Sequence, residues 1–578
     1  MSIAAAPSIS KLATGIDGFD RLSGGGVPEG RTTLLVGGPG TGKTVFALNT
    51  LANRLRDAGE SGIFVTFEED ADTLIANAAS FGWTLSSGGA AEGGPGIFVL
   101  DAKLNPDVAQ SGDFDLNGLI GALTALKERT GARLIVLDSI DWLLAMLDSG
   151  AARRRELLRL RQWLRQEGAT ALLTAKTDQP LEGDAESALA YLPYMTECVV
   201  VLHHEVSRRV ARRWIRLLKY RGAAHNSNAS PLLIRSGGIM VIADKVDMGW
   251  PASTERVSSG IERLDTMLNG GYYRSSTVLV SGAPGTAKST LGGAFVDAAC
   301  RRGERALFYS FDEPAAQIAR NLRSVNIDLG AHVDSGLLSI LASRASANSM
   351  EEQFAALRDA VELHKPQAVV IDPISAIGKI NEETESSAII VQMLDYMKAR
   401  GITVLATALL HPLHRDTEGT QYHISTIADT WMDVSFRIAK GERNRALTIV
   451  KSRGMAHSNQ VRELVLSSRG LTLADVYASG GDVLMGTARM EHEAEDRVHE
   501  ALQQAEHTHR RKELENLEQR LALQLQMLQA EISQARNERE RILLEEDIRR
   551  KERSDARTHV RMMRRADDTG ARETETQS

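Results

Sequence analysis

The chain is poor in several features that would each indicate a particular class of protein. It has only two cysteines, Cys198 and Cys300, whose separation fits neither a disulfide framework nor the ligand spacing of a zinc site. No apolar run is long enough to span a bilayer, and the start MSIAAAPSISKLATG lacks the basic residues and apolar block of a signal peptide. Aromatic residues make up 5% of the chain and its net charge is -7, which disfavours a dedicated nucleic-acid binder. We therefore expect a cytoplasmic protein.

An internal repeat dominates what the sequence does contain. The segment TGIDGFDRLSGGGVPEGRTTLLVGGPGTGKT, Thr14–Thr44, recurs as SGIERLDTMLNGGYYRSSTVLVSGAPGTAKS, Ser259–Ser289, at an offset of 245 residues. That period is far too long for a solenoid. Later segments also match, such as RLIVLDSI with AVVIDPI and KYRGAAH with KSRGMAH. The sequence therefore predicts two tandem domains of similar fold, joined by a linker near Met240–Ser253.

Each copy alternates short apolar runs with amphipathic stretches, such as TTLLVGG, VFALNTLANRLRDAG and GIFVTF in the first copy. Continuous apolar runs of this length are typical of strands that are buried on both faces. Such strands pair into mostly parallel sheets that are covered by helices. We therefore predict two α/β domains, the first at residues 1–245 and the second at residues 246–475.

The strongest chemical signal is GGPGTGKT, which follows a predicted strand and precedes a helical pattern. In a phosphate-binding loop of this kind, backbone N–H groups wrap the phosphates, the lysine reaches the β- and γ-phosphates, and the hydroxyl binds Mg²⁺. The second copy reads GAPGTAKS, with Ala287 where the pattern has glycine; alanine is tolerable there if the residue has ordinary helical dihedrals. The two ATP sites are expected to contain Gly38, Pro39, Gly40, Thr41, Gly42, Lys43 and Thr44, and Ala283, Pro284, Gly285, Thr286, Ala287, Lys288 and Ser289.

An aspartate ends one apolar strand run in each copy, Asp138 in the first and Asp372 in the second. A carboxylate in that place can hold Mg²⁺ through water, together with the loop hydroxyls of Thr44 and Ser289. The alternative for each aspartate is a buried capping role.

Paired carboxylates end the neighbouring strand run: Glu68 and Glu69 in the first copy, Asp312 and Glu313 in the second. Beside a phosphate site, such a pair suits a general base that positions a water or a hydroxyl. A solvated loop is the alternative, although recurrence in both copies favours catalysis. Because Asp312 is one methylene shorter than Glu68, the two sites need not perform the same reaction.

A basic pattern, Lys-x-Arg-Gly-x-x-His, occurs late in each copy. Its charges could line a wetted sheet edge, or they could reach the γ-phosphate of a neighbouring subunit as arginine fingers do. We favour the second interpretation, which implies a ring with nucleotide between subunits. The residues concerned are Lys219, Arg221 and His225, and Lys451, Arg453 and His457.

Three hydroxyl residues, Thr420, Ser425 and Thr426, lie close together around His423 in GTQYHISTIADTW. They could form a strand and turn with local hydrogen bonds, or they could be substrates of the second nucleotide site. The residues alone leave both interpretations open.

Taken together, these motifs resemble the KaiC family of circadian clock proteins, whose members are tandem RecA-like ATPases that form a two-tiered hexamer. The resemblance covers roughly residues 8–470 and also rests on Asn77–Trp83, which adds Ser80 to the ATP site, and on HISTIADT. It implies ATP hydrolysis in the first domain and serine/threonine autokinase activity in the second, with ATP and Mg²⁺ as cofactors. It further implies that Ser425 and Thr426 are the enzyme's own substrate, with Thr420 as a weaker candidate.

The resemblance also has consequences for partners. GDFDLNGLI, Gly112–Ile120, resembles the segment on which KaiB docks in the family, with Phe114 between two aspartates. The short tail that engages KaiA has no clear counterpart in LTLADVYASGGDVLMG, so a KaiA partner is doubtful. Two residues depart from the family pattern: Asp312 replaces a glutamate, and Val325 replaces an aromatic residue near adenine. Both departures put the rate of the kinase in question more than its existence.

The C-terminal segment has a different character. From Met490 to about Arg565 it contains neither proline nor glycine, and apolar residues recur at steps of 3 and 4 from Leu514 to Ala535, and again seven residues later at Ile542. This heptad seam predicts a long coiled-coil helix within residues 476–567, followed by a disordered end at 568–578. Helices emerging from a hexamer could join two rings tail to tail as a dodecamer.

Two other functions compete with a KaiC-like ATPase and autokinase. A RecA- or DnaB-like recombinase or helicase uses the same core on DNA, but the acidic balance and few aromatic residues disfavour it. A scaffold that binds ATP only to assemble is disfavoured by two complete sets of magnesium ligands.

Overall fold

The computed structural model describes residues 9–87, 94–103, 116–147, 149–176, 191–207, 210–243, 253–344, 348–377, 383–410, 424–439, 441–479 and 482–563. The chain divides into two compact units, Met1–Val476 and Tyr477–Ser578. The first unit contains two α/β sheets, and the second contains a small hairpin and a long helix. No helix in the described part of the chain is both long and apolar enough to cross a membrane.

The first sheet has ten strands in the order β12-β11-β10-β9-β3-β8-β7-β4-β6-β5. Its strands from β9 to β5 are parallel, whereas the pairs among β9, β10, β11 and β12 are antiparallel. The strands are β3 (Thr32–Gly37), β4 (Gly62–Thr66), β5 (Ser86–Ser87), β6 (Ile97–Asp101), β7 (Leu134–Asp138), β8 (Thr170–Lys176), β9 (Cys198–Ser207), β10 (Val210–Tyr220), β11 (Ser230–Arg235) and β12 (Gly238–Val241).

Both faces of this sheet are buried, as the continuous apolar runs predict. Consecutive residues of β3 enter different cores: Leu35 packs in one cluster with Phe46, and Leu34 packs in the other with Trp163. This follows because successive side chains on a strand point to opposite faces. The helices of this domain include α2 (Lys43–Ala58), α3 (Ala71–Ala79), α5 (Asn117–Thr130), α6 (Ile140–Ala145), α7 (Gly150–Gln166) and α8 (Leu192–Met195).

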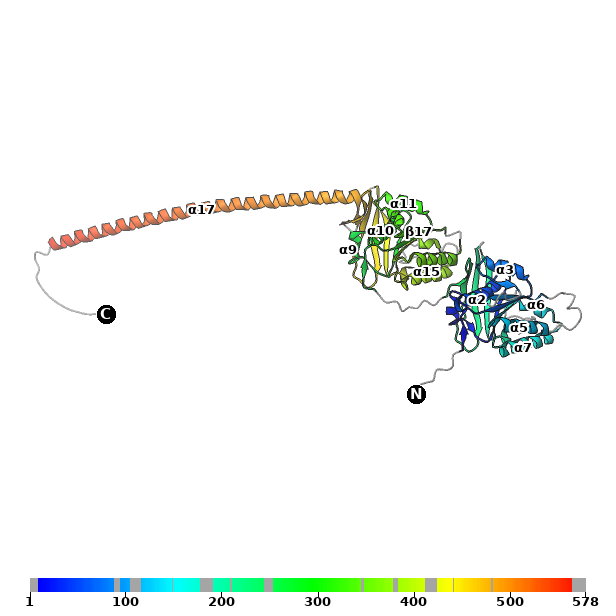
Figure 1. Ribbon diagram of the computed structural model, residues 1–578. Coiled ribbons are helices and arrows are strands. Elements are labelled where there is room, and N and C mark those ends of the chain that lie inside the picture. Colours follow the sequence, from blue (N-terminus) through cyan, green and yellow to red (C-terminus); the bar gives the residue numbers. More distant parts are fainter. Residues whose placement is uncertain are drawn as a thin grey trace, which may run out of the picture. The chain divides into compact units, whose positions relative to one another are not determined.

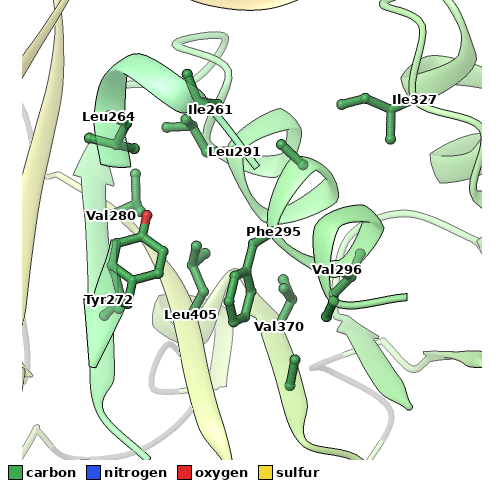
Figure 2. Packing of buried hydrophobic residues seen from close by; sticks show 14 of the residues in the cluster. Ile261, Leu264, Tyr272, Val280, Leu291, Phe295, Val296, Ile327, Val370 and Leu405 are labelled. Atoms are coloured by element: carbon green, nitrogen blue, oxygen red, sulfur yellow. The ribbon is translucent and has the colours of Figure 1, made fainter. Parts of the chain in front are cut away.

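The second sheet has nine strands in the order β17-β16-β18-β19-β15-β20-β21-β22-β23. Figure 2 shows Phe295 of α10 between Leu405 and Val370 in the core on one face of this sheet. The strands are β15 (Thr277–Gly282), β16 (Ala306–Ser310), β17 (Leu338–Ala342), β18 (Ala368–Asp372), β19 (Thr403–Leu409), β20 (Thr430–Ala439), β21 (Glu442–Ser452), β22 (Arg462–Ser467) and β23 (Gly470–Ala474). The helices include α10 (Lys288–Arg301), α11 (Ala315–Arg323), α12 (Leu329–Asp334), α13 (Met350–His364), α14 (Ile374–Ile377), α15 (Glu383–Lys398) and α16 (Ile424–Ile427).

The two sheets repeat one plan around the phosphate loop. In each, the strand before the loop, β3 or β15, pairs in parallel with one strand on either side, and the strand ending at Asp138 or Asp372 lies one place further out. The strands that carry the loop, the aspartate and the paired carboxylates therefore all end at one edge of the sheet. The predicted fold class, two tandem α/β domains with mostly parallel sheets flanked by helices, is confirmed.

The C-terminal unit is built around α17 (Gly486–Met563), one continuous helix in Figure 1. Its 78 residues extend over about 120 Å at a rise of about 1.5 Å per residue. A hairpin of β24 (Tyr477–Ser479) and β25 (Asp482–Leu484) anchors its start, because Tyr477 stacks on His492 and donates a hydrogen bond to Asp496. The leucines of the predicted seam, Leu514, Leu517, Leu521, Leu525 and Leu528, are all exposed within a single chain.

Candidate functional site

The first phosphate loop is shaped by glycines in left-handed conformations. Gly40 has φ 69° and Gly42 has φ 98°, and α2 begins at the next residue, Lys43. The ammonium of Lys43 donates to the carbonyls of Gly37 and Gly38 at 2.7 and 2.9 Å. Burial lowers the pKa of Lys43, and the carboxylates of Asp138 and Asp141 oppose that shift. A buried lysine next to the N-terminus of a helix is the cationic lining that a polyphosphate needs.

The second loop has the same geometry, but its alanine does not meet the condition under which it would be tolerated without strain. Lys288 donates to the carbonyls of Gly282 and Ala283 at 3.0 and 2.8 Å. Ala287 has φ 75° and ψ 28°, a left-handed conformation like that of Gly42, and therefore does not have ordinary helical dihedrals. The tight turn into α10 requires a left-handed residue whatever its side chain. For an L-amino acid this conformation costs about 1–2 kcal/mol.

A hydroxyl and a carboxylate meet beside each loop. The Thr44 hydroxyl donates to Asp138 Oδ2 at 2.8 Å, and the Thr174 hydroxyl donates to Oδ1. In the second domain, Asp372 accepts hydrogen bonds from Ser289 and Thr407. Burial raises the pKa of both aspartates, and these hydroxyl donors partly offset the effect.

These oxygen pairs suit a hard divalent cation. Mg²⁺ at nucleotide sites is bound by one or two protein oxygens together with phosphate oxygens and waters. A larger cluster is not required, and among the described residues no group of three or more His, Cys, Asp or Glu side chains is arranged to hold a metal. The fit therefore rests on Thr44 with Asp138 and on Ser289 with Asp372.

The paired carboxylates directly follow the strand that lies next to the one ending at Asp138 or Asp372. Thr66 pairs with Asp138 across β4 and β7, and Ser310 pairs with Asp372 across β16 and β18. Glu68 and Asp312 follow two residues later, so both occupy the same place relative to the loop. The charge of Asp312 contributes to the raised pKa of Asp372, after burial as the main cause. Of the second members, Glu313 accepts a hydrogen bond from Asn321 at 3.1 Å, whereas the backbone N–H of Glu69 donates to the Thr66 hydroxyl.

Sequence reasoning missed the partner of Glu68. The ammonium of Lys176, at the end of β8, donates to both oxygens of Glu68 at 2.6 Å. A signal was present, because TALLTAK ends an otherwise apolar strand run with a lysine. It also missed two arginines that hold the loops: Arg213 donates to the carbonyl of Gly40 at 2.9 Å, and Arg445 donates to that of Gly285 at 3.2 Å.

The Lys-x-Arg pairs contact short helices within their own chain. Lys451 donates to the carbonyl of Ser425 at 2.6 Å, and Arg453 donates to that of Thr426 at 2.6 Å. In the first domain Lys219 donates to the carbonyl of Pro193, and Arg221 donates to that of Tyr194 at 3.1 Å. Pro193 and Tyr194 therefore occupy the positions of Ser425 and Thr426. A role toward a neighbouring subunit's phosphate stays a prediction.

The two predicted acceptors differ in exposure. Ser425 is buried, with 7% of its surface exposed, whereas Thr426 is exposed. Thr420, His423 and Phe114 lie outside the described residues.

The remaining predicted site residues make contacts within their own domains. Ser80 follows α3 and donates to the carbonyl of Asn77 at 2.7 Å, and Val325 packs against the core of the second domain. Of the histidines, His225 Nδ1 lies 3.3 Å from the carbonyl of Ala223, whereas His457 Nδ1 is buried without a hydrogen-bond partner among the described residues.

Comparisons with known proteins agree with this geometry. A sequence model of the KaiC ATPase family matches residues 12–246 and 257–476. The circadian clock protein KaiC2 of Synechocystis sp. is 37% identical over 93% of this chain and 94% of its own length. The circadian clock oscillator proteins KaiC of Thermostichus vulcanus and Synechococcus elongatus are each 33% identical over 83% of this chain and 92% of their own lengths. Since 93% of this chain cannot be covered without part of α17, the similarity to the KaiC2 protein extends into that helix.

Proposed function

The chain belongs to the KaiC family of ATPases, and from that premise we propose that its first domain hydrolyses ATP and its second domain phosphorylates the chain itself. The observation that supports this most is the repeated set of a phosphate-loop lysine, a hydroxyl–aspartate pair and a strand-end carboxylate. Membership of this family also favours an ATPase of the clock type over a recombinase or helicase.

In the first domain, Glu68 is the general base and Glu69 supports it. The carboxylate accepts a proton from water while the water oxygen bonds to the γ-phosphorus and the bond to the bridging oxygen breaks. Thr44 and Asp138 would hold Mg²⁺, which neutralises charge on the phosphates when it is bound. Lys43 positions the same phosphates from the start of α2.

In the second domain, Asp312 takes the proton of a serine or threonine hydroxyl instead of water. The acceptors are Ser425 and Thr426, on the short helix whose carbonyls Lys451 and Arg453 hold. The corresponding first-domain positions, Pro193 and Tyr194, offer no aliphatic hydroxyl. This difference supports a hydrolysing first domain and a kinase second domain.

The functional assembly is a hexameric ring with nucleotide between subunits. Lys219, Arg221, Lys451 and Arg453 then act at the subunit boundary, where arginine-finger residues contact a neighbour's γ-phosphate. The seam of α17 has no partner within the described chain, and a lone helix cannot bury it. Two rings joined by their tails as a dodecamer would cover it. A KaiB-like protein is the expected partner of the first domain, and a timing or signalling role would follow from phosphorylation.

Mass spectrometry after incubation with MgATP tests the kinase assignment. We expect phosphate on Ser425 and Thr426 in the chain without substitutions. We expect this phosphate to be lost in the Asp312→Asn variant. Asn321→Ala serves as a control, because it removes a contact of Glu313 without touching Asp312. Phosphorylation elsewhere, or full phosphorylation of Asp312→Asn, would contradict the assignment.

A further inference from the structure

Lys176 brings a second ammonium group to the first nucleotide site. It ends β8, which lies between β3, the strand before the phosphate loop, and β7, the strand that ends at Asp138. Besides its ion pair with Glu68, its backbone N–H donates to Asp141 at 3.1 Å. Lys176 is the register partner of Gly37 across β8 and β3, and the Lys43 ammonium donates to the carbonyl of Gly37 at 2.7 Å. Both lysines therefore lie at the end of β3 where the phosphate loop begins, beside the space that the terminal phosphate of ATP would enter.

The second domain lacks this cation at the matching position. The backbone N–H of Leu409 donates to the Ser375 hydroxyl at 3.0 Å, as that of Lys176 donates to Asp141. Thr174 and Thr407, two residues earlier on their strands, bond the two metal aspartates in the same way. Because the backbones match, Leu409 is the structural counterpart of Lys176. The ammonium group is thus particular to the domain that we propose to hydrolyse ATP.

We propose that Lys176 is a positioning residue that exchanges Glu68 for the γ-phosphate when ATP binds. The Lys176 ammonium holds the Glu68 carboxylate by both oxygens. When ATP enters, the phosphate oxygens take the ammonium, and Glu68 is released to accept the proton of the attacking water. The role of Glu68 as general base after its release rests on the proposed hydrolysis. The exchange itself is a binding event and does not depend on turnover.

The strength of the ion pair suits such an exchange. Lys176 and Glu68 are 39% and 40% exposed, so water and salt screen their attraction. The terminal phosphate carries more charge than a carboxylate and lies in a site already lined by amide groups and Lys43. The terminal phosphate should therefore displace Glu68 from the Lys176 ammonium, and breaking the exposed ion pair costs little free energy. ADP, which has no γ-phosphate, would leave the Lys176–Glu68 pair in place.

Equilibrium binding of ADP and of β,γ-imido-ATP to the full chain tests the exchange. All proteins carry Lys288→Ala, so that the first site dominates the signal, and Mg²⁺ is present throughout. Lys176→Leu, which installs the second domain's residue, should reduce the preference for the triphosphate analogue about tenfold, through loss of a charge-assisted contact. Lys176→Arg should retain most of the preference. Glu68→Gln should raise the preference by about threefold, because the competing carboxylate is gone.

Lys103 provides a matched control, because it follows β6 of the same sheet by two residues and also pairs with a carboxylate, that of Asp70. Lys103→Leu should leave the ratio of the two affinities unchanged. The proposal is overturned if Lys176→Leu leaves this ratio unchanged, or if Glu68→Gln lowers it. Thermal unfolding of each variant shows whether the fold is retained. If Glu68→Gln raises the ratio but hydrolyses ATP normally, the general-base assignment fails while the exchange at Lys176 stands.

Discussion

The residue before the phosphate-loop lysine gives the sharpest test of how the two loops differ. Gly42 and Ala287 both adopt left-handed conformations, with φ 98° and 75°. A left-handed conformation costs an L-residue about 1–2 kcal/mol. Replacing Ala287 with glycine removes that strain but adds about 0.4–1 kcal/mol of unfolded-state entropy. We therefore expect Ala287→Gly to stabilise the second domain by up to about 1 kcal/mol.

The reverse substitution in the first domain should be harmful. A Cβ on Gly42 would lie 2.8 Å from Cδ1 of Ile234 on β11, in addition to the backbone strain. Gly59, which ends α2, has φ 65°, and a Cβ added there would have no neighbouring atom within 4 Å, so Gly59→Ala measures the backbone strain alone. Gly42→Ala should destabilise the first domain by more than Gly59→Ala does. The difference between the two combines the contact with Ile234 and the additional strain of φ 98° at Gly42, which lies farther from the left-handed minimum than φ 65° does.

Hydrogen exchange followed by mass spectrometry resolves the two domains within the full chain. Protection of α10 should increase in Ala287→Gly, and protection of α2 should decrease in Gly42→Ala. Thermal unfolding of the affected domain should shift by about 2–4 °C per kcal/mol for domains of this size. A clear loss of stability in Ala287→Gly, or equal tolerance of Gly42→Ala and Gly59→Ala, would refute the reasoning from backbone conformation and contact.

The sites and the tail give four further predictions. Glu68→Gln should reduce the hydrolysis of ATP by the first domain about 10²–10⁴-fold, the usual contribution of a general base; unchanged turnover would remove Glu68 from the mechanism. Thr426 should gain phosphate before Ser425, because it is exposed while Ser425 is buried, and a time course by mass spectrometry that shows the opposite order would contradict this. Ser425→Ala/Thr426→Ala should lose most of the incorporated phosphate. Deleting the chain after about Met490 should halve the particle mass measured by light scattering while hydrolysis continues, and an unchanged mass would exclude joining of rings by the tail.

The sequence predicts those parts of the molecule that depend on local pattern. The apolar runs indicate strands buried on both faces because the alternation of side chains along a strand needs no tertiary information, and Leu34 and Leu35 do enter opposite cores. The contact of Thr44 with Asp138 follows from the phosphate-loop motif together with a strand-end aspartate. The alternation is set within one short segment, whereas the contact joins two residues 94 apart in sequence and could be anticipated because each belongs to a motif whose chemical partner is known.

Contacts that depend on strand order could not be predicted in the same way. Lys176 and Glu68 are 108 residues apart in sequence and meet only because β8 and β4 flank β7. Alanine favours helical dihedrals, yet the turn into α10 determines the φ of Ala287. The local preference of a side chain is worth about 1 kcal/mol or less, which the packing of a whole domain overrides.

The matching backbones of the two domains show which side chains could give them the different chemistry that we propose. Equivalent basic residues hold equivalent carbonyls, Lys219 and Lys451 at Pro193 and Ser425, so the short helix is held in the same place in both domains. Asp138 and Asp372 likewise have matching hydroxyl neighbours. What differs is the side chains on the short helix, Pro193 and Tyr194 against Ser425 and Thr426, and the residue that ends the strand next to the loop strand, Lys176 against Leu409. A hydroxyl on the short helix and a neutral Leu409 suit transfer to the protein, whereas a helix without such a hydroxyl and the cation of Lys176 suit transfer to water. A change in a few side chains on a common backbone is therefore sufficient, on this argument, to separate a hydrolase from a kinase.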